Sequence, residues 1–245
     1  MFSFFKNKKS AEISGNYFPF KTDMHSHILP GIDDGSPDVA TSIKLIKGLM
    51  EMGVTRSIAT PHIIGDLYRN DHTTINAALK ILQDELKKQK INFKVSAAAE
   101  YMLDSYFYEI LNGKEKLLTL TDNIILTEFS YASMPEDPGK MSFAIIMEGY
   151  VPILAHPERY PYYYDNYKMF HHLDELGYKL QVNLLSLTGY YGKEAFKVAS
   201  YLLKNDLVSY VGTDMHHERH LGMLSDPKIR SGFNKMLSHK SWNEF

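Results

Sequence analysis

The feature that most constrains this chain is a repeated alternation of short apolar segments with segments of helical periodicity. Seven segments have the composition of β-strands: Phe20–His25, Arg56–Thr60, Lys94–Glu100, Asn123–Glu128, Val151–His156, Lys179–Asn183 and Val208–Asp214. Because helices that connect successive strands impose right-handed crossovers, this alternation predicts a mainly parallel sheet. Seven units favour closure into a barrel, and an open doubly wound sheet is the alternative.

Two of the intervening segments carry clear helix signals. Ser36-Pro37-Asp38 supplies an N-cap, a proline for the first turn and an early acid, before an apolar stripe that ends at Gly53. The segment Thr73–Lys90 has apolar residues on one face, and its lysine-rich end suits the negative pole of a helix dipole. Further helices are expected at Asp104–Leu111, Gly139–Glu148, Asn166–Leu176, Lys193–Lys204 and Lys228–Leu237.

The length of the chain, 245 residues, suits one large α/β domain, and no Pro-, Gly- or Ser-rich linker divides it. We therefore expect an N-terminal tail at residues 1–18 and a single domain at residues 19–245. The tail opens with an apolar run that is too short for a signal segment or a membrane span. These features predict a cytoplasmic protein without an integral membrane segment.

Charge and cysteine content narrow the possible chemistry. The formal net charge is −2, which gives no reason to expect a nucleic acid as partner, because such binding requires clustered Lys and Arg. The chain has no cysteine, so disulfides, thiolate catalysis and Cys-ligated zinc are excluded. Any metal ion must therefore be held by His, Asp and Glu.

Metal-binding residue types mark the ends of six of the seven strand candidates. They are His25 and His27, then His62, Glu100, Glu128 and His156, and finally Asp214 with His216. In a parallel barrel all strand C-termini open on one face, so these side chains are expected to converge there. Imidazoles and carboxylates together suit Mn²⁺, Fe²⁺ or Zn²⁺, and bridging carboxylates allow several ions close together. The pattern predicts a multinuclear metal site.

Each of these residues also has an ordinary structural explanation. A His-x-His pair is often hydrogen bonded near a surface, and His62 and His156 each adjoin a proline in a loop-like sequence. Glu100 could pair with a lysine, and Asp214 could cap a turn. Only the coincidence of residue type and position at several different strand ends favours the metal site.

Three further acidic or basic residues lie close to these strand ends. Asp33 precedes Asp34-Gly35, and for Asp33 a turn and a metal ligand are equally supported. Arg159 follows His156 and could present its planar guanidinium to a phosphate; the alternative is a surface ion pair with Glu158 or Asp165. Arg219 has a similar position after His216 and less support.

Residues 160–167 contain five tyrosines and interrupt the alternation, so we expect an exposed loop between a strand and a helix. This loop could be a lid or a stacking wall for an aromatic substrate, but packing on the scaffold is the favoured interpretation. His171, His172 and His239 fall outside the strand-end pattern, so we leave them out of the site.

The strand-end residues lie in motifs that resemble those of the polymerase and histidinol phosphatase (PHP) superfamily. Within it, the chain is most similar to the bacterial manganese-dependent protein-tyrosine phosphatases of capsule and exopolysaccharide operons. The motifs are Asp-Met-His-Ser-His-Ile-Leu-Pro-Gly-Ile-Asp-Asp-Gly-Ser at 23–36, Ala-Thr-Pro-His at 59–62, Ala-Glu-Tyr at 99–101, Ala-His-Pro-Glu-Arg-Tyr at 155–160 and Gly-Thr-Asp-Met-His at 212–216. The resemblance implies a distorted (β/α)7 TIM-like barrel in a single α/β domain.

The resemblance also implies three divalent metal ions, Mn²⁺ by preference and Fe²⁺ or Zn²⁺ otherwise. Carried over by motif, the ligands are His25, His27, Glu100 and Asp214 for one ion, Glu100, Glu128 and His156 for a second, and Asp34, His62 and His216 for a third. Arg159 matches the phosphate-binding arginine of the family. A second arginine of the family usually lies about five residues after the last histidine, whereas Arg219 follows His216 by three.

The implied reaction is hydrolysis of phosphotyrosine on a protein, by in-line attack of a hydroxide that bridges two metal ions. Arg159 would stabilise charge on the phosphate, and His62 or His216 would protonate the leaving group. The implied substrate is the tyrosine-rich tail of a bacterial polysaccharide-export kinase. Two alternatives stay open: a small-molecule phosphatase such as histidinol phosphatase, and a metal-stabilised scaffold module without turnover.

Overall fold

The strands of the computed structural model, which describes residues 18–113 and 115–245, form two parallel sheets. The first sheet contains β1 (Thr22–Asp23), β2 (Arg56–Ala59) and β4 (Lys94–Ala97). The second has the order β3 (His62–Ile63), β5 (Glu100–Met102), β6 (Ile124–Glu128), β7 (Val151–Ala155), β8 (Lys179–Asn183) and β9 (Val208–Gly212). Within each sheet the strands pair in the order of the chain, which agrees with the expected α/β fold.

One expected strand is interrupted and another is followed by a short additional strand, which explains why the structure has more strands than the sequence predicts. The predicted strand Lys94–Glu100 is divided into β4 and β5, and β3 continues the direction of β2 after Thr60-Pro61. Hydrogen bonds still cross the interruption, because Ala98 N donates to Ala59 O at 2.8 Å and Glu100 N donates to Pro61 O at 3.0 Å. A proline has no N–H to donate, so a regular ladder cannot pass through Pro61.

The outer strands of the two sheets, β1 and β9, are connected by side chains and by the segments that follow them. Ser26 forms a parallel bridge with Met215, and His27 N donates to Met215 O at 2.9 Å. Along the strands themselves, the Asn243 amide donates to Thr22 O of β1 at 2.9 Å and to Val211 O of β9 at 2.7 Å. The C-terminal segment therefore holds β1 and β9 side by side.

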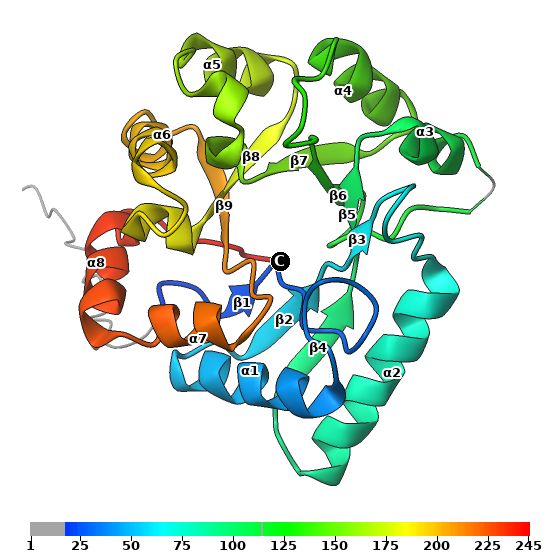
Figure 1. The fold of residues 1–245 in the computed structure, drawn as a ribbon, viewed down its shortest axis with the longest axis vertical. Helices are drawn as coiled ribbons and strands as arrows, with labels where there is room; N and C mark the ends of the chain where they lie inside the picture. Colours follow the sequence, from blue (N-terminus) through cyan, green and yellow to red (C-terminus); the bar gives the residue numbers. More distant parts are fainter. Residues whose placement is uncertain (1–17, 114) are drawn as a thin grey trace, which may run out of the picture.

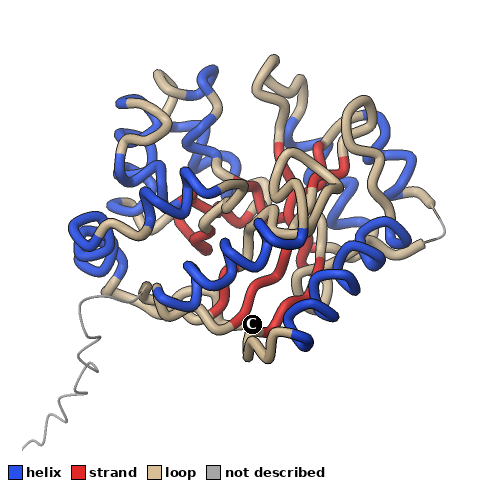
Figure 2. The backbone as a smooth tube through the Cα atoms, turned by 60° about the horizontal axis from the view of Figure 1, so that its bottom comes forward, coloured by secondary structure: helices blue, strands red, loops and turns tan. Residues whose placement is uncertain are grey.

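Helices surround the strands in Figure 1, and Figure 2 shows the same arrangement from another side. They are α1 (Val39–Glu51), α2 (His72–Lys88), α3 (Ser105–Leu111), α4 (Pro138–Met147), α5 (Lys168–Glu175), α6 (Lys193–Lys204), α7 (Glu218–Leu224) and α8 (Pro227–Leu237). Helix α7 was not expected from the sequence. Among the described residues, no helix has the length and apolarity required to cross a membrane.

The start of α1 differs from the sequence prediction. Asp38, and not Ser36, is the N-cap, because the Asp38 carboxylate accepts a hydrogen bond from Thr41 N at 2.8 Å. Ser36 serves the preceding loop instead: its backbone N donates to His27 O at 2.9 Å. Pro37 therefore precedes the cap rather than opening the helix. The hydrogen bond from Ser36 N to His27 O holds the loop after β1 against the segment that contains His25 and His27.

The tyrosine-rich segment packs on the scaffold and is less exposed than expected. Tyr160 and Tyr163 are buried, and the short 3₁₀ turn Pro161–Tyr163 lies between strand β7 and helix α5. The Tyr160 hydroxyl donates to Ala155 O at 3.0 Å and accepts from Phe129 N at 2.9 Å. The prediction of an exposed loop was therefore wrong for the tyrosines, whereas Pro161, Asp165 and Asn166 are exposed, and the packing interpretation agrees with the structure.

Of the expected N-terminal tail, residues 1–17 lie outside the described residues. Phe18, at the expected boundary, is buried and stacks on Phe20 with 5.2 Å between ring centroids. Its ring also contacts Phe233 of α8 at 6.0 Å, and its backbone N donates to Met52 O. Burial of apolar side chains in this way stabilises the folded chain from Phe18 onward.

Candidate metal centre

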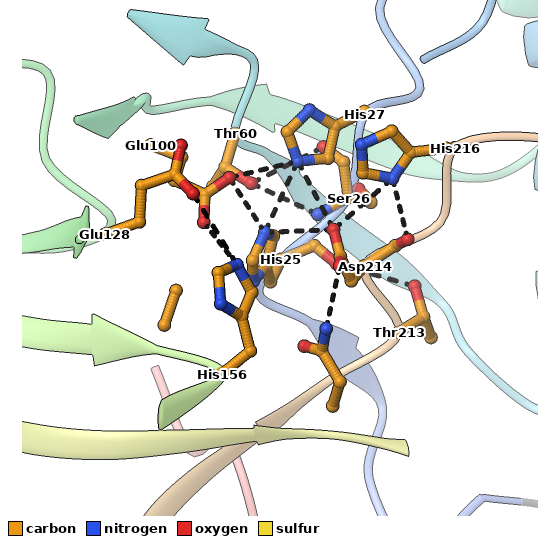
Figure 3. A network of polar contacts seen from close by, with 12 residues as sticks. His25, Ser26, His27, Thr60, Glu100, Glu128, His156, Thr213, Asp214 and His216 are labelled. Atoms are coloured by element: carbon orange, nitrogen blue, oxygen red, sulfur yellow. Dashed lines mark hydrogen bonds and ion pairs between the residues drawn. The ribbon is translucent and has the colours of Figure 1, made fainter. Parts of the chain in front are cut away.

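The ends of β1 and β9 bring the first group of predicted residues together (Figure 3). The Nε2 atoms of His25 and His27 lie 3.3 Å apart, and His25 Nε2 lies 3.2 Å from both Glu100 Oε2 and Asp214 Oδ1. All four side chains are almost completely buried. The two imidazoles of the His-x-His pair thus point at the same pair of carboxylates.

Glu100, at the start of β5, lies between several imidazoles. Its Oε2 is 3.3 Å from His27 Nε2 and 3.3 Å from His62 Nδ1, while its Oε1 is 3.0 Å from His156 Nε2. Glu128, at the end of β6, places Oε1 3.0 Å from His62 Nδ1. The Glu100 carboxylate therefore faces ligand candidates from three other strand ends, which is the arrangement a bridging ligand requires.

A third group lies nearer to solvent. Asp34 Oδ1 is 3.6 Å from Nε2 of His62 and 3.6 Å from Nε2 of His216. The Asp34 side chain is 53% exposed, whereas His62 and His216 are 12% and 14% exposed. The rings of His27 and His216 stack with centroids 3.9 Å apart. An ion in this group would be the one most accessible to a substrate.

The donor atoms are grouped tightly enough for metal binding. Four sets have all their potential ligand atoms within 4.8 Å of one another: His27, Asp34, His62 and His216; His25, His27 and Glu100; His25, His156 and Asp214; and His62, Glu100 and Glu128. Every predicted metal ligand occurs in at least one set. The structure thus brings all nine residues together, and their roles as ligands stay a prediction.

Several of these buried atoms have no hydrogen-bond partner in the described part of the chain. They are His62 Nδ1, Glu100 Oε2, Glu128 Oε1 and Asp214 Oδ1. A buried polar atom without a partner costs about 1–3 kcal/mol, and such atoms are rare in native proteins. Coordination of a divalent cation would satisfy all four, so the residues present fit a metal centre.

Mutual attraction in this cluster shifts the pKa values of its members. Burial alone would lower the pKa of His62, but Glu128 and Glu100 outweigh it and raise this pKa to about 9. Burial alone would raise the pKa of Glu100, yet the imidazoles of His25 and His62 hold it well below its ordinary value. In the metal-free state His62 is therefore protonated at neutral pH beside these carboxylates.

Two carboxylates outside the predicted ligand set support the site: Asp33, for which the sequence left a turn and a metal ligand open, and Asp23, which sequence reasoning missed. Asp33 Oδ2 accepts from His27 Nδ1 at 2.7 Å, while Asp33 Oδ1 accepts from Gly35 N at 3.0 Å. Asp33 is therefore both a turn residue and a support for His27. At the end of β1, the buried Asp23 carboxylate accepts from the Thr213 hydroxyl at 2.6 Å. The motif Asp-x-His was the available signal for Asp23.

The backbone at two strand ends has left-handed geometry. His156 has a φ of 35° and Asp214 a φ of 50°, a region that is uncommon for residues other than glycine. Close packing restricts a third position, because a Cβ at Gly35 would lie 2.1 Å from His27 O. The chain turns sharply at these positions, and the turns direct the ligands inward.

Arg159 borders the cluster and is clamped between aromatic rings. Its Nη1 donates to Asp214 Oδ2 at 2.8 Å, and its guanidinium carbon lies 4.1 Å from the centroid of Tyr191 and 5.1 Å from that of Tyr131. The expected alternative, an ion pair with Glu158 or Asp165, is not what the structure contains. The arginine therefore faces the metal centre.

A cavity of ≈250 Å³ opens over the cluster. Its wall contains predicted ligands together with four residues that the sequence did not single out, and it is lined by Asp34, His62, Glu128, Tyr131, His156, Arg159, Tyr191, Asp214, His216, His217 and His220. Arg219 does not belong to this lining, and its exposed side chain lies over the Tyr190 ring at 5.4 Å. Its predicted role in substrate binding stays a prediction.

The sequence matches proteins of one family over almost its whole length. Residues 21–240 match the family described as capsular polysaccharide synthesis, CpsB/CapC. The tyrosine-protein phosphatase YwqE of Bacillus subtilis is 32% identical over 196 residues, which cover 80% of this chain and 77% of that protein. The putative tyrosine-protein phosphatase CapC of Staphylococcus aureus is 27% identical over 194 residues, which cover 79% and 76% of the two chains.

The fold is also similar to that of a solved structure. This structure comes from work on YwqE of Bacillus subtilis and CpsB of Streptococcus pneumoniae, described there as unique metal-dependent tyrosine phosphatases. The TM-score is 0.79 at 29% sequence identity, and the match covers 91% of this chain and 88% of the other. By sequence and by fold, this chain belongs to the CpsB/CapC family of capsular polysaccharide synthesis.

Proposed function

We propose that this chain is a metal-dependent phosphatase that hydrolyses phosphotyrosine on proteins. The observation that carries the proposal is the position of Arg159, which lies at the cavity wall against Asp214 of the metal cluster. A guanidinium beside a multinuclear metal centre is suited to a phosphate group, whose oxygens accept from arginine in a bidentate manner. The tyrosine-protein phosphatase names of the relatives support the same activity.

We further propose three divalent ions, with Mn²⁺ as the preferred metal and Fe²⁺ or Zn²⁺ as the others that these ligands accept. The ligands would be His25, His27, Glu100 and Asp214, then Glu100, Glu128 and His156, and then Asp34, His62 and His216. When bound, such ions lower the pKa of water to about 7 and act as Lewis acids on phosphate oxygens. That chemistry supplies a nucleophile near neutral pH in a chain without cysteine.

The remaining work falls to the side chains around the cavity. Arg159 would bind the phosphate oxygens and stabilise their charge as the bond between phosphorus and the tyrosine oxygen breaks. Tyr131 and Tyr191 flank the arginine at the cavity wall, where a phenyl ring can stack. His62 or His216 would donate a proton to the leaving phenolate, which needs this help less than an alkoxide does.

The finer features of architecture and setting are also proposals. The contacts of Asn243 and Ser26 between β1 and β9 support closure of the strands into a distorted (β/α)7 barrel, with residues 19–245 as its domain. We place the protein in the cytoplasm. Its partner would be a phosphorylated bacterial tyrosine kinase with a tyrosine-rich tail. The substrate would be that tail, because a flexible chain end can reach the ligands at the base of the cavity.

Rates on three substrates test the proposal and separate it from a small-molecule phosphatase. Purified protein loaded with Mn²⁺ is assayed on a phosphotyrosine peptide, on histidinol phosphate and on p-nitrophenyl phosphate. We expect the largest kcat/KM on the peptide and loss of all activity after chelation. A strong preference for histidinol phosphate would instead establish the small-molecule alternative.

The scaffold alternative requires a different comparison. His25→Ala removes an imidazole whose Nε2 faces both Glu100 and Asp214, so we expect it to abolish phosphatase activity and lower the metal content. A scaffold would give no turnover even in the metal-loaded wild type, and its binding to a partner would survive His25→Ala. Turnover by the metal-loaded wild type is therefore sufficient to exclude the scaffold alternative.

A further inference from the structure

Strand β8 ends in two buried amides rather than in ionisable residues, and it is the one strand of the expected seven that supplies no predicted metal ligand. Gln181 and Asn183 point to the same side of the strand, and both are 0% exposed. A completely buried amide must find partners for its oxygen and for its N–H groups. The partners of these two amides are side chains of the metal cluster.

The hydrogen bonds form one continuous chain between two predicted ligands. His25 Nδ1 lies 2.7 Å from Gln181 Oε1, and Gln181 Nε2 donates to Asn183 Oδ1 at 2.9 Å. Asn183 Nδ2 then donates to Asp214 Oδ2 at 2.7 Å. Each amide uses its oxygen on one side and its nitrogen on the other, so the chain has a direction.

That direction follows from the carboxylate at its end. The Asp214 carboxylate can only accept, so the Asn183 atom that faces it must be the amide nitrogen. The Asn183 oxygen then faces Gln181 and must accept from the Gln181 nitrogen. This leaves the Gln181 oxygen facing His25, whose Nδ1 must therefore carry a hydrogen.

We propose that Gln181 and Asn183 are positioning residues that set the His25 tautomer and the orientation of Asp214 for metal binding. With its hydrogen fixed on Nδ1, His25 presents the lone pair of Nε2 to the metal site, 3.2 Å from Glu100 Oε2 and from Asp214 Oδ1. With Oδ2 held by Asn183, Asp214 presents Oδ1, the oxygen without a hydrogen-bond partner.

Asn183 is itself anchored from behind. Its backbone N donates to Glu158 Oε1 at 3.0 Å, and the same oxygen accepts from the Ser186 hydroxyl at 2.6 Å. Glu158 and Ser186 are both 0% exposed. Close packing leaves Gln181 little alternative space, because a Cβ at Gly212 would lie 3.0 Å from its Nε2. The amide chain therefore has a single arrangement in this fold.

The test measures metal affinity and the His25 tautomer, and it rests on the metal site of the proposed function. Gln181→Leu removes both the acceptor and the donor with little change in volume, and it is expected to weaken Mn²⁺ binding by about 10–100-fold. In metal-free protein, at a pH high enough to leave the histidine rings neutral, ¹⁵N NMR should show the Nδ1–H form of His25 in the wild type and loss of that preference in the variant.

Two further variants separate positioning from loss of folding. Gln181→Glu keeps the acceptor for His25 but loses the donor to Asn183, so the Nδ1–H form should persist while Mn²⁺ affinity falls. Ser142→Ala, in α4 and remote from the site, removes the hydrogen bond from a buried hydroxyl to Leu176 O at the end of α5 and should leave Mn²⁺ affinity unchanged. This control shows what the loss of a hydrogen bond remote from the metal centre does to Mn²⁺ affinity.

Wild-type Mn²⁺ affinity in Gln181→Leu, or an unchanged His25 tautomer there, would overturn the inference. Should Gln181→Leu fail to fold, Gln181→Glu alone decides, because wild-type affinity in that variant also overturns it. Neither readout involves phosphotyrosine. A protein whose Mn²⁺ affinity depended on these amides but that hydrolysed no phosphopeptide would contradict the proposed function and still support the inference.

Discussion

Nη1 of Arg159 donates to Oδ2 of Asp214, the same oxygen that accepts from Asn183. The predicted phosphate-binding residue is thus in direct contact with a predicted metal ligand. The rings of Tyr131 and Tyr191 hold the guanidinium plane at the wall of the cavity. Arginine and metal centre are therefore one unit, and a phosphate at the metal ions would meet the guanidinium at the same time.

Arg159→Lys should lower kcat on a phosphotyrosine peptide by about 100-fold or more, with Mn²⁺ content unchanged. An ammonium group on a flexible stem cannot fill the flat space between two rings or bind a phosphate in a bidentate manner. Steady-state kinetics and metal analysis of the same sample provide the measurement. Activity within threefold of the wild type would contradict the role of Arg159, and Arg230→Lys in α8 is the matched control.

Arg219→Ala tests the other predicted substrate contact. Because this side chain is exposed and lies outside the cavity lining, we expect KM for a phosphopeptide to rise by about two- to fivefold, as for a charge at the edge of an interface. The kcat/KM on p-nitrophenyl phosphate should not change, since this small substrate does not reach Arg219. An equal loss on both substrates would instead indicate a role at the reacting phosphate.

Mn²⁺ affinity should rise with pH up to about 9. Without metal, His62 has a pKa raised to about 9 by Glu128 and Glu100, which outweigh its burial, so it is protonated at neutral pH. A metal ion must displace that proton, and binding therefore becomes stronger as pH rises. Calorimetry in buffers of different ionisation enthalpy measures the protons released. An affinity that did not change between pH 6 and pH 8 would refute this linkage.

Glu158→Gln should change the pH dependence of stability. Burial raises the pKa of Glu158 from 4.5 to about 7, in spite of hydrogen bonds from Ser186 and Asn183. The stability that protonated Glu158 contributes is therefore fully present below pH 4.5. It is lost as pH rises through 7, and the free energy of unfolding falls by roughly 3 kcal/mol in total. In urea unfolding of metal-free protein, this loss should be absent in the variant. The same slope in both proteins would exclude Glu158 as its source.

Gly35→Ala should damage the site through the backbone. The new Cβ would lie 2.1 Å from His27 O and 2.4 Å from His27 Cβ, so His27 must move. We expect the free energy of unfolding to fall by about 2 kcal/mol or more and Mn²⁺ binding to weaken. Gly222→Ala in α7 is the control, because a Cβ there meets no atom within 4 Å and alanine favours a helix. Equal losses of stability and of Mn²⁺ affinity in Gly35→Ala and Gly222→Ala would contradict this prediction.

Much of the fold was predictable because the strands are short, apolar and separated by helices of clear periodicity. The strands ending at Glu128 and Asn183 have the predicted bounds or nearly so. The division of Lys94–Glu100 was not predictable, since Ala98 and Ala99 give no local signal for an interruption. Helix α7 (Glu218–Leu224) was missed because polar residues fill its first turn and Gly222 lies within it, so no apolar stripe stands out.

The candidate site also has one part that was predictable from the sequence and one part that was not. Ionisable residues at strand ends were visible in the sequence, and the structure brings all nine of the predicted ligands together. Gln181 and Asn183 were not visible, because a neutral amide at a strand end has no special chemistry until its partners are known. Tyr131 and Tyr191 were missed for a related reason. Their position beside Arg159 depends on loops that are distant in the sequence.

The left-handed backbone at His156 and Asp214 has a consequence for how this protein can change. Such conformations cost a side chain on the order of 1 kcal/mol or more, and glycine adopts them without that cost. His156→Gly and Asp214→Gly would relieve this backbone cost, but they would take one buried partner from Glu100 and the buried ion-pair partner from Arg159. Glycine therefore suits the backbone at these two positions without being a neutral replacement, and the surrounding ion pairs oppose its fixation there.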